Sequence, residues 1–386
     1  MRLFFSLFFA IGYIFPVLGQ NQKETSFVAP LHFNKVKVSS ETYESVGVFD
    51  VNEDGHPDLV SGAFWYEGPN FINRHGIAEV NRVGEYWDDF STIPLDVNGD
   101  GKIDFITGGW FGATLFWFEN PGNNESWKKH IIDSTGNIET ARGWDIDVDG
   151  TIEIVPNTPG QPLKYYRLNK DAKGKGTGEF TKIDVAATHG HGLGFGDING
   201  DKRGDIIVNN GWLESPLDPN GKWILHQEFE FGDASVPMLV VDINKDGLND
   251  LIVGQGHSYG LDWYEQQIDS KGKRKWIKHP IDPYNSQFHT MEWEDIDGDG
   301  EPELITGKRY RAHNGGDPGA NDPFGLYYYK WNGESFTKNV ISYGPVDQGK
   351  GAGIYFSISD LRGTGRKDII VAGKDGLYIF FNEGSR

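Results

Sequence analysis

One short acidic motif occurs seven times along the 386 residues, and this repetition constrains the fold more than any other feature of the sequence. The first copy, residues 50–58, reads DVNEDGHPD, with oxygen-bearing side chains at positions 1, 3, 5 and 9 and glycine at position 6. The other copies begin at Asp96, Asp145, Asp197, Asp242, Asp295 and Asp360, at spacings of 45 to 65 residues. Self-similarity at such a period is the signature of a repeat architecture.

The motif has the chemistry of a calcium loop. Calcium binds six to eight oxygen ligands, and the glycine allows the backbone conformation that a sharp turn requires. A single copy could be an acidic turn without metal, because Asp, Asn and Gly are ordinary turn residues. An EF-hand is disfavoured, because its loop closes with a carboxylate at position 12 between two helices. Six complete copies favour structural calcium, and six ions would offset twelve charges of the net −20.

The predicted calcium ligands are the side chains at positions 1, 3, 5 and 9 of the first six copies. They are Asp50, Asn52, Asp54, Asp58, Asp96, Asn98, Asp100, Asp104, Asp145, Asp147, Asp149, Glu153, Asp197, Asn199, Asp201, Asp205, Asp242, Asn244, Asp246, Asp250, Asp295, Asp297, Asp299 and Glu303. In the seventh copy Arg362 and Thr364 replace two ligands, so we expect no ion there.

The segments around each loop predict four β-strands per repeat. An apolar run follows the loop, then an aromatic strand such as residues 64–66, then a strand with aromatic and basic residues such as 127–132. Seven such units predict an all-β, seven-bladed β-propeller over residues 32–386. The last repeat lacks a fourth strand, and residues 33–38 have the pattern of one. We expect this N-terminal strand to close the ring and leave no open sheet edge.

The N-terminus and the composition predict an exported protein. Arg2 followed by an apolar run over residues 3–18 is typical of a signal peptide, which we place at residues 1–19, with a short segment at residues 20–31 before the propeller. With no cysteine, the chain has neither disulfides nor a lipid-anchored cysteine. The acidic surface disfavours nucleic acid. We expect a secreted or periplasmic monomer without a membrane anchor.

The loops resemble those of FG-GAP/VCBS repeat proteins, whose β-propellers occur in integrin α-subunits and in many secreted bacterial proteins. The resemblance covers residues 32–384 and implies a propeller with calcium loops, whereas propellers host many functions. The chain also resembles the propeller portion of aldos-2-ulose dehydratase-like sugar dehydratases and, more distantly, seven-bladed ulvan lyases. The similar stretches are HGHGLG at 189–194, GQGH at 254–257, SQFHT at 286–290 and GKRYRAHN at 307–314.

Polar residues of the repeats are expected to gather on the face opposite the calcium loops. One position, six residues before each loop, would form a ring of Glu44, Phe90, Glu139, His191, Val236, His289 and Ile354. Each residue also has a structural interpretation: a histidine can hold a hydrogen bond, a tryptophan can pack between blades, and a basic run can be a solvated loop. The convergence of several titratable groups from separate blades favours a site.

The candidate residues come from this ring, from the loops between second and third strands, and from a long insertion in the sixth repeat. The predicted catalytic residues are His191, His257, Tyr259, His289, Tyr310 and His313. The predicted substrate-binding residues are Trp110, Trp212, Gln287, Lys308, Arg309, Arg311 and Lys374.

Three function classes fit these residues. We place first a carbon–oxygen lyase on a uronic acid: Arg309 or Arg311 would hold the carboxylate, and His and Tyr would act as base and acid. Dehydration of the terminal uronic acid of an oligosaccharide is favoured over cleavage of a glycosidic bond. A non-catalytic carbohydrate- or protein-binding propeller comes second. A metallohydrolase comes third, with His191, His289 and a ring glutamate as ligands of one further divalent metal, which could also assist elimination.

Overall fold

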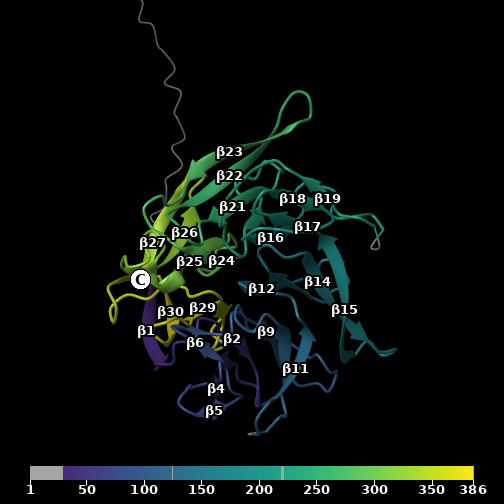
Figure 1. Ribbon diagram of the computed structural model, residues 1–386. Coiled ribbons are helices and arrows are strands. Elements are labelled where there is room, and N and C mark those ends of the chain that lie inside the picture. Colours follow the sequence, from purple (N-terminus) through teal and green to yellow (C-terminus); the bar gives the residue numbers. More distant parts are fainter. Residues whose placement is uncertain (1–28, 124, 219–220, 386) are drawn as a thin grey trace, which may run out of the picture.

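The computed structural model describes residues 29–123, 125–218 and 221–385 as short strands joined by turns. The strands form seven four-stranded sheets arranged around a common centre (Figure 1). The expected all-β, seven-bladed propeller is confirmed. The expected signal peptide, residues 1–19, lies outside the described residues. The described part of the chain contains no helix of the length and apolar character needed to cross a membrane.

Each blade places its strands in order from the centre of the ring to the rim. Blade one contains β2 (Gly47–Phe49), β3 (Asp58–Ser61), β4 (Phe64–Tyr66) and β5 (Arg74–Gly76). Blade two contains β8 (Ile93–Leu95), β9 (Asp104–Gly108), β10 (Leu115–Glu119) and β11 (Lys128–Asp133). Blade three contains β12 (Thr140–Trp144), β13 (Glu153–Asn157), β14 (Leu163–Lys170) and β15 (Gly176–Ala186). Blade four contains β16 (Leu193–Gly196), β17 (Asp205–Val208), β18 (Gly211–Glu214) and β19 (Ile224–His226).

The remaining blades follow the same plan. Blade five contains β20 (Leu239–Val241), β21 (Asp250–Gly254), β22 (Leu261–Ile268) and β23 (Arg274–Pro280). Blade six contains β24 (Phe288–Glu294), β25 (Glu303–Lys308), β26 (Phe324–Trp331) and β27 (Phe336–Gly344). Blade seven contains β28 (Ser357–Ser359), β29 (Asp368–Val371), β30 (Leu377–Ser385) and β1 (Leu31–Ser39). Outside the blades lie a hairpin of β6 (Arg82–Val83) and β7 (Tyr86–Trp87) and the 3-10 turn η1 (Ala312–Gly315).

Blade seven is assembled from both ends of the chain. Strand β1 pairs antiparallel with β30, and Val36 lies opposite Ile379 in the register. The outer edge strand of the last blade therefore comes from the N-terminal segment, and the pairing joins the first and last blades (Figure 1).

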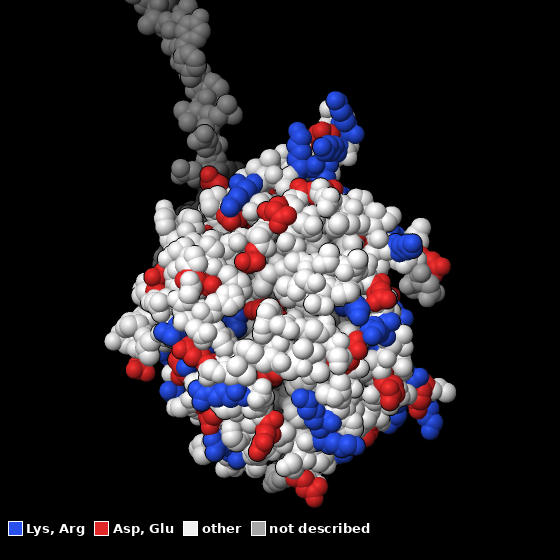
Figure 2. All heavy atoms as spheres, viewed as in Figure 1, with Lys and Arg blue, Asp and Glu red and all other residues white. Residues whose placement is uncertain are grey.

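The hydrophobic core lies between the blades. The second strands are buried along their whole length because they are apolar and covered on both faces. Tyr165 of blade three packs with Leu193 and Ile206 of blade four in one such cluster, and the other blade pairs repeat the arrangement. Burial of this apolar surface holds the blades together without disulfides. On the face shown in Figure 2, acidic and basic side chains are intermixed.

Candidate functional site on the face opposite the acidic loops

The acidic loops have closely similar geometries. In the first loop the Asp50 carboxylate accepts the backbone N–H of Asp54 at 3.1 Å and of Gly55 at 2.8 Å, while Asp58 accepts that of Val51 at 2.8 Å. The loop backbone thus holds the carboxylates of positions 1, 5 and 9 close to one another. Their oxygen atoms form a ligand set that fits calcium. Burial raises the pKa of the position-9 acid, to about 7 for Asp104.

Basic side chains pair with some of these loops. Arg167 lies 2.7 Å from Asp147 in the third loop, and Lys330 lies 3.3 Å from Glu303 in the sixth. In the seventh loop Arg362 lies 3.2 Å from Asp368. In that loop the guanidinium is the cation partner of the position-9 carboxylate.

On the opposite face, two glutamates of the ring position meet an arginine from another blade. Glu44 precedes β2, Glu139 precedes β12 and Arg309 follows β25. Arg309 Nε donates to Glu44 Oε1 at 3.1 Å and Nη1 to Glu139 Oε1 at 2.7 Å. All three side chains are buried. Two carboxylates therefore share one guanidinium inside the protein.

Three histidines lie beside Glu139. His289 Nε2 is 2.9 Å from Glu139 Oε1, and His191 Nε2 is 3.7 Å from the same oxygen. His257 Nε2 lies 3.1 Å from His191 Nε2. Glu139, His191, His257 and His289 can each offer one ligand atom within 4.8 Å of the others, so they could hold a metal ion. We call these four residues the His–Glu cluster.

Burial dominates the electrostatics of the His–Glu cluster. Burial and the charge of Arg309 hold the pKa of His289 well below its usual value, and burial lowers that of His257 to about 4. Burial alone would raise the pKa of Glu139, but its contacts with His191, His289 and Arg309 hold that pKa well below its usual value. At neutral pH this favours an ionised Glu139 beside uncharged His257 and His289.

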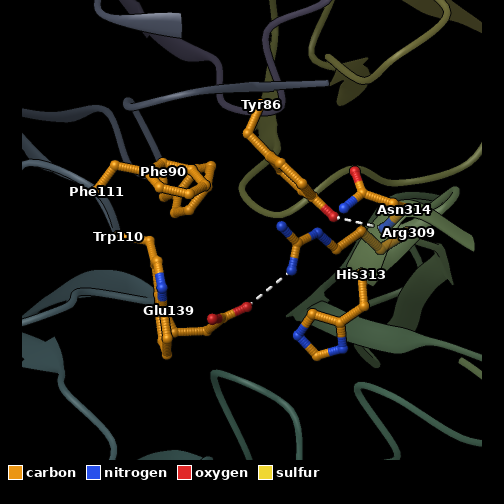
Figure 3. A pocket seen from close by; sticks show the side chains of 8 residues that line it. All are labelled: Tyr86, Phe90, Trp110, Phe111, Glu139, Arg309, His313 and Asn314. Atoms are coloured by element: carbon orange, nitrogen blue, oxygen red, sulfur yellow. Dashed lines mark hydrogen bonds and ion pairs between the residues drawn. The ribbon is translucent and has the colours of Figure 1, made fainter. Parts of the chain in front are cut away.

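A pocket of about 280 Å³ opens next to the cluster. Its lining residues are Tyr86, Phe90, Trp110, Phe111, Glu139, Arg309, His313 and Asn314. Figure 3 shows the aromatic rings of Phe90, Phe111 and Trp110 on one side and Arg309, His313 and Asn314 on the other. The pocket therefore combines an apolar, aromatic wall with a polar, charged one.

The polar wall comes from the insertion between β25 and β26. Asp317 accepts hydrogen bonds from His257 Nδ1 at 2.9 Å and from His313 Nδ1 at 2.8 Å. The two imidazole rings stack with their centroids 4.4 Å apart. Asn314 N donates to the Tyr86 hydroxyl at 3.0 Å. These contacts fix the insertion against blades one, two and five and orient His313 towards the pocket.

Several residues that were predicted to bind substrate or to act in catalysis do not line this pocket. Lys308 is buried and donates to Ser286 Oγ at 2.8 Å and to the Gly319 carbonyl, so it anchors the insertion, and burial lowers its pKa to about 8. Gln287 is buried beneath Asp317. Tyr259 is exposed and donates to Asp322 at 2.7 Å.

Trp212 is a correction. We expected it to stack on a sugar, but it lies within β18, is 2% exposed and stacks on His226 with ring centroids 4.2 Å apart. It packs between blades four and five, in a cluster with Phe231, Met238 and Leu251.

Tyr310, Arg311 and Lys374 surround a second, smaller pocket of about 200 Å³. There Arg311 Nη2 donates to Glu85 at 2.8 Å, and Lys374 Nζ donates to the Arg311 carbonyl at 2.7 Å. The expected bidentate clamp by Arg309 is also changed, since Glu44 and Glu139 occupy its Nε and Nη1.

Sequence reasoning missed three residues: Tyr86 and Phe111, which line the pocket, and Asp317, which accepts a hydrogen bond from His313. Tyr86 belongs to the β6–β7 hairpin, which is outside the repeat pattern. The sequence feature that could have indicated Tyr86 and Phe111 is the long segment between the first blade and the second acidic loop. Extra residues at one face of a propeller have to fold over that face. Asp317 was hidden inside an insertion of polar residues.

Comparisons with known proteins identify the repeats and the fold. Residues 96–156 and 242–306 match the FG-GAP-like repeat, so the chain contains FG-GAP-like repeats within a seven-bladed propeller. No curated protein sequence matches the chain.

Solved structures share the architecture at low sequence identity. BBS1N in complex with ARL6DN, soaked with mercury, is 13% identical, with 90% of this chain and 95% of that chain covered and a TM-score of 0.54. The lead-soaked form of that complex is 12% identical over 92% and 96%, with a TM-score of 0.51. Rhamnogalacturonan lyase YesW is 12% identical over 90% and 75%, with a TM-score of 0.48. The likeness to BBS1N shows the fold alone.

Proposed function

We propose that this protein is an exported carbon–oxygen lyase that eliminates water from the terminal uronic acid residue of an oligosaccharide. The observation that carries the proposal is the pocket, in which an aromatic wall faces Arg309 and His313. Aromatic rings such as Trp110 suit the apolar faces of sugar rings, and Nη2 of Arg309, which donates to neither Glu44 nor Glu139, can donate to a carboxylate. The volume of about 280 Å³ is small for a ligand pocket, which favours a chain end over a chain interior.

The elimination needs a base for the acidic C5–H beside the carboxylate. His313 donates its Nδ1 hydrogen to Asp317, which leaves Nε2 as the proton acceptor. Asp317 thereby holds the imidazole in one tautomer and orientation, as an orienting group does for a general base. The proton from C5 would move to His313 Nε2, and the electron pair would form the new double bond as the C4–O bond breaks.

The departing C4 oxygen needs a proton donor. The Tyr86 hydroxyl accepts the N–H of Asn314, so its own hydrogen remains available to the pocket. Burial raises the pKa of Tyr86, which keeps it protonated at neutral pH and able to donate. Transfer of this proton releases water, and proton exchange with solvent restores both side chains.

The acidic loops belong to the same proposal as structural elements. Six calcium ions would neutralise their carboxylates and join the first and second strands of six blades. Export through the signal peptide would bring the protein to a compartment that contains calcium. Because the chain has no cysteine, the ions would take the stabilising role that disulfides have in other exported proteins.

The test is incubation with uronic-acid oligosaccharides, monitored by the ultraviolet absorbance of the conjugated double bond and by product mass. We expect loss of one water from an otherwise intact oligosaccharide. His313→Gln and Tyr86→Phe should each lower turnover by about 10²–10⁴-fold with the melting temperature unchanged. The control is Tyr284→Phe at a fully solvated position, which should keep wild-type activity. A shortened product would show glycosidic cleavage instead, and binding without any product would show a non-catalytic propeller.

A further inference from the structure

In the His–Glu cluster, two imidazole nitrogen atoms that are both hydrogen-bond acceptors lie next to each other. His191 Nδ1 lies 2.7 Å from the carbonyl oxygen of Ala234, which can only accept, so this nitrogen carries the hydrogen. His257 Nδ1 likewise faces the Asp317 carboxylate at 2.9 Å. In both neutral rings the Nε2 atom is then an acceptor. These two acceptors face one another at 3.1 Å, which is unfavourable unless a cation lies between them, either a proton carried by one of the nitrogens or a metal ion.

The spacing of the ligand atoms suits a small metal ion. A tetrahedral site with metal–ligand distances of about 2.1 Å has ligand atoms about 3.4 Å apart. Three of the separations here are 3.1, 3.7 and 3.9 Å, between His191 and His257, His191 and Glu139, and His257 and Glu139. His289 Nε2 lies 2.9 Å from the same Glu139 oxygen. Modest adjustment would place all four atoms around one ion.

The charge of the surroundings also calls for a cation. Glu44, Glu139 and Asp317 are carboxylates, and Arg309 is the cation that pairs with the first two. Lys350 and Lys374 also interact with Glu44. Glu139 and Asp317 are therefore the carboxylates that an ion in the cluster would face. Oε2 of Glu44 is buried and has no hydrogen-bond partner among the described residues. A buried carboxylate is costly without a cation, and a divalent ion in the cluster would bind Glu139 directly.

We propose that Glu139, His191, His257 and His289 bind one divalent transition-metal ion of the zinc class. Imidazole ligands select such ions over calcium, which prefers oxygen alone. The Ala234 carbonyl and Asp317 orient two of the ligand rings, as outer partners do at metal sites. The ion would tie blades three, four, five and six together beneath the pocket, and its positive charge would suit an anionic substrate.

The metal content can be measured without any substrate, so this test is independent of the proposed reaction. Purified protein would be stripped with a chelator selective for transition metals, kept in excess calcium, and titrated with Zn²⁺ and Co²⁺. We expect one equivalent of either ion per chain by mass spectrometry. The cobalt form should show the visible absorption of a nitrogen-ligated, four-coordinate centre.

Variants locate the site. His191→Ala and His257→Ala should weaken zinc binding by about 100-fold or more, and Asp317→Asn by about 10- to 100-fold. His289→Ala should cost less, because His289 Nδ1 has no partner in the described part of the chain to orient the ring. His279→Gln, on β23 at the rim, is the matched control and should bind as the wild type does.

Glu139→Gln guards against loss of folding, because it keeps the shape and removes the charge; it should also weaken binding while circular dichroism stays unchanged. Absence of a tight zinc equivalent in the wild type would overturn the proposal. So would zinc binding that survives unchanged in folded His191, His257 and Glu139 variants.

Discussion

The acidic loops and the pocket occupy opposite faces of one disc and use the chain in different ways. Each loop takes its carboxylates from nine consecutive residues, and the copies share closely similar hydrogen bonds. The pocket face joins residues that are far apart: His289 bonds to Glu139 across 150 positions, and Arg309 bonds to Glu44 across 265. One face is therefore repetitive and local, whereas the other is unique and depends on closure of the ring.

This difference teaches how the propeller separates stability from specificity. A loop that is copied around the ring supplies a similar local constraint to each blade. The repeat position at the pocket face varies from Glu44 to Phe90 to His191 without changing the strand pattern. Because the blades support these side chains independently of their identity, a site can be assembled from different blades on a constant frame.

Calcium removal should produce the largest effect and would test the role of the loop face. Each ion bound only to the native state adds about 2.7 kcal/mol at a hundred times its dissociation constant. Several ions together approach the whole stability of a typical domain, about 5–15 kcal/mol. We expect EDTA to lower the melting temperature sharply in a calorimetric scan. An identical melting curve, with no calcium found by mass spectrometry, would rule out structural calcium.

Substitution of two tryptophans, Trp212 and Trp110, would distinguish a residue that packs between blades from one that binds substrate. Trp212→Ala should cost about 3–5 kcal/mol of unfolding free energy in urea, because it empties a buried position between blades. Trp110→Ala should change stability far less, because Trp110 is half-buried at the pocket wall. Its effect should instead be weaker oligosaccharide binding by calorimetry. Equal destabilisation by both substitutions would contradict the assignment of Trp110 to the pocket.

The seventh loop allows a smaller and sharper test. Arg362→Asp with Thr364→Asp restores carboxylates at positions 3 and 5 and removes the guanidinium that now pairs with Asp368. We expect the double variant to bind one more calcium ion in equilibrium dialysis and to melt higher at saturating calcium.

The control for this variant is Arg366→Asp, which also removes a positive charge in the loop but at a position that supplies no ligand. We expect its calcium content to equal that of the wild type. An extra ion in the control would show that charge rather than ligand position governs binding. No extra ion in the double variant would show that carboxylates at positions 3 and 5 do not suffice to restore the site.

Local sequence patterns carried the prediction of the fold. The nine-residue motif, the apolar run after it and the aromatic third strand each recur in register, so seven copies could be counted before any contact was known. The blade count and the all-β class followed, because each pattern reflects the local pleat and turn.

The same reasoning could place residues at the pocket face but could not decide which of them meet. His191, His257 and His289 were expected on this face, and they form one cluster. Trp212 and Gln287 were expected there too, yet Trp212 is buried between two blades and Gln287 is buried beside Asp317. A side chain at the end of a strand can point to solvent, to a neighbouring blade or into the pocket, and the local pattern is the same in each case.

The amino-acid sequence by itself thus determined the repeat, its register and the loops that could hold calcium, because these depend on residues within one turn of the chain. Only the tertiary structure decided that Tyr86 from an extra hairpin faces Arg309, and that Asp317 joins His257 to His313. Those contacts depend on the distances across a closed ring and on the path of the long insertion between β25 and β26. They are set by the packing of all seven blades, which no single repeat encodes.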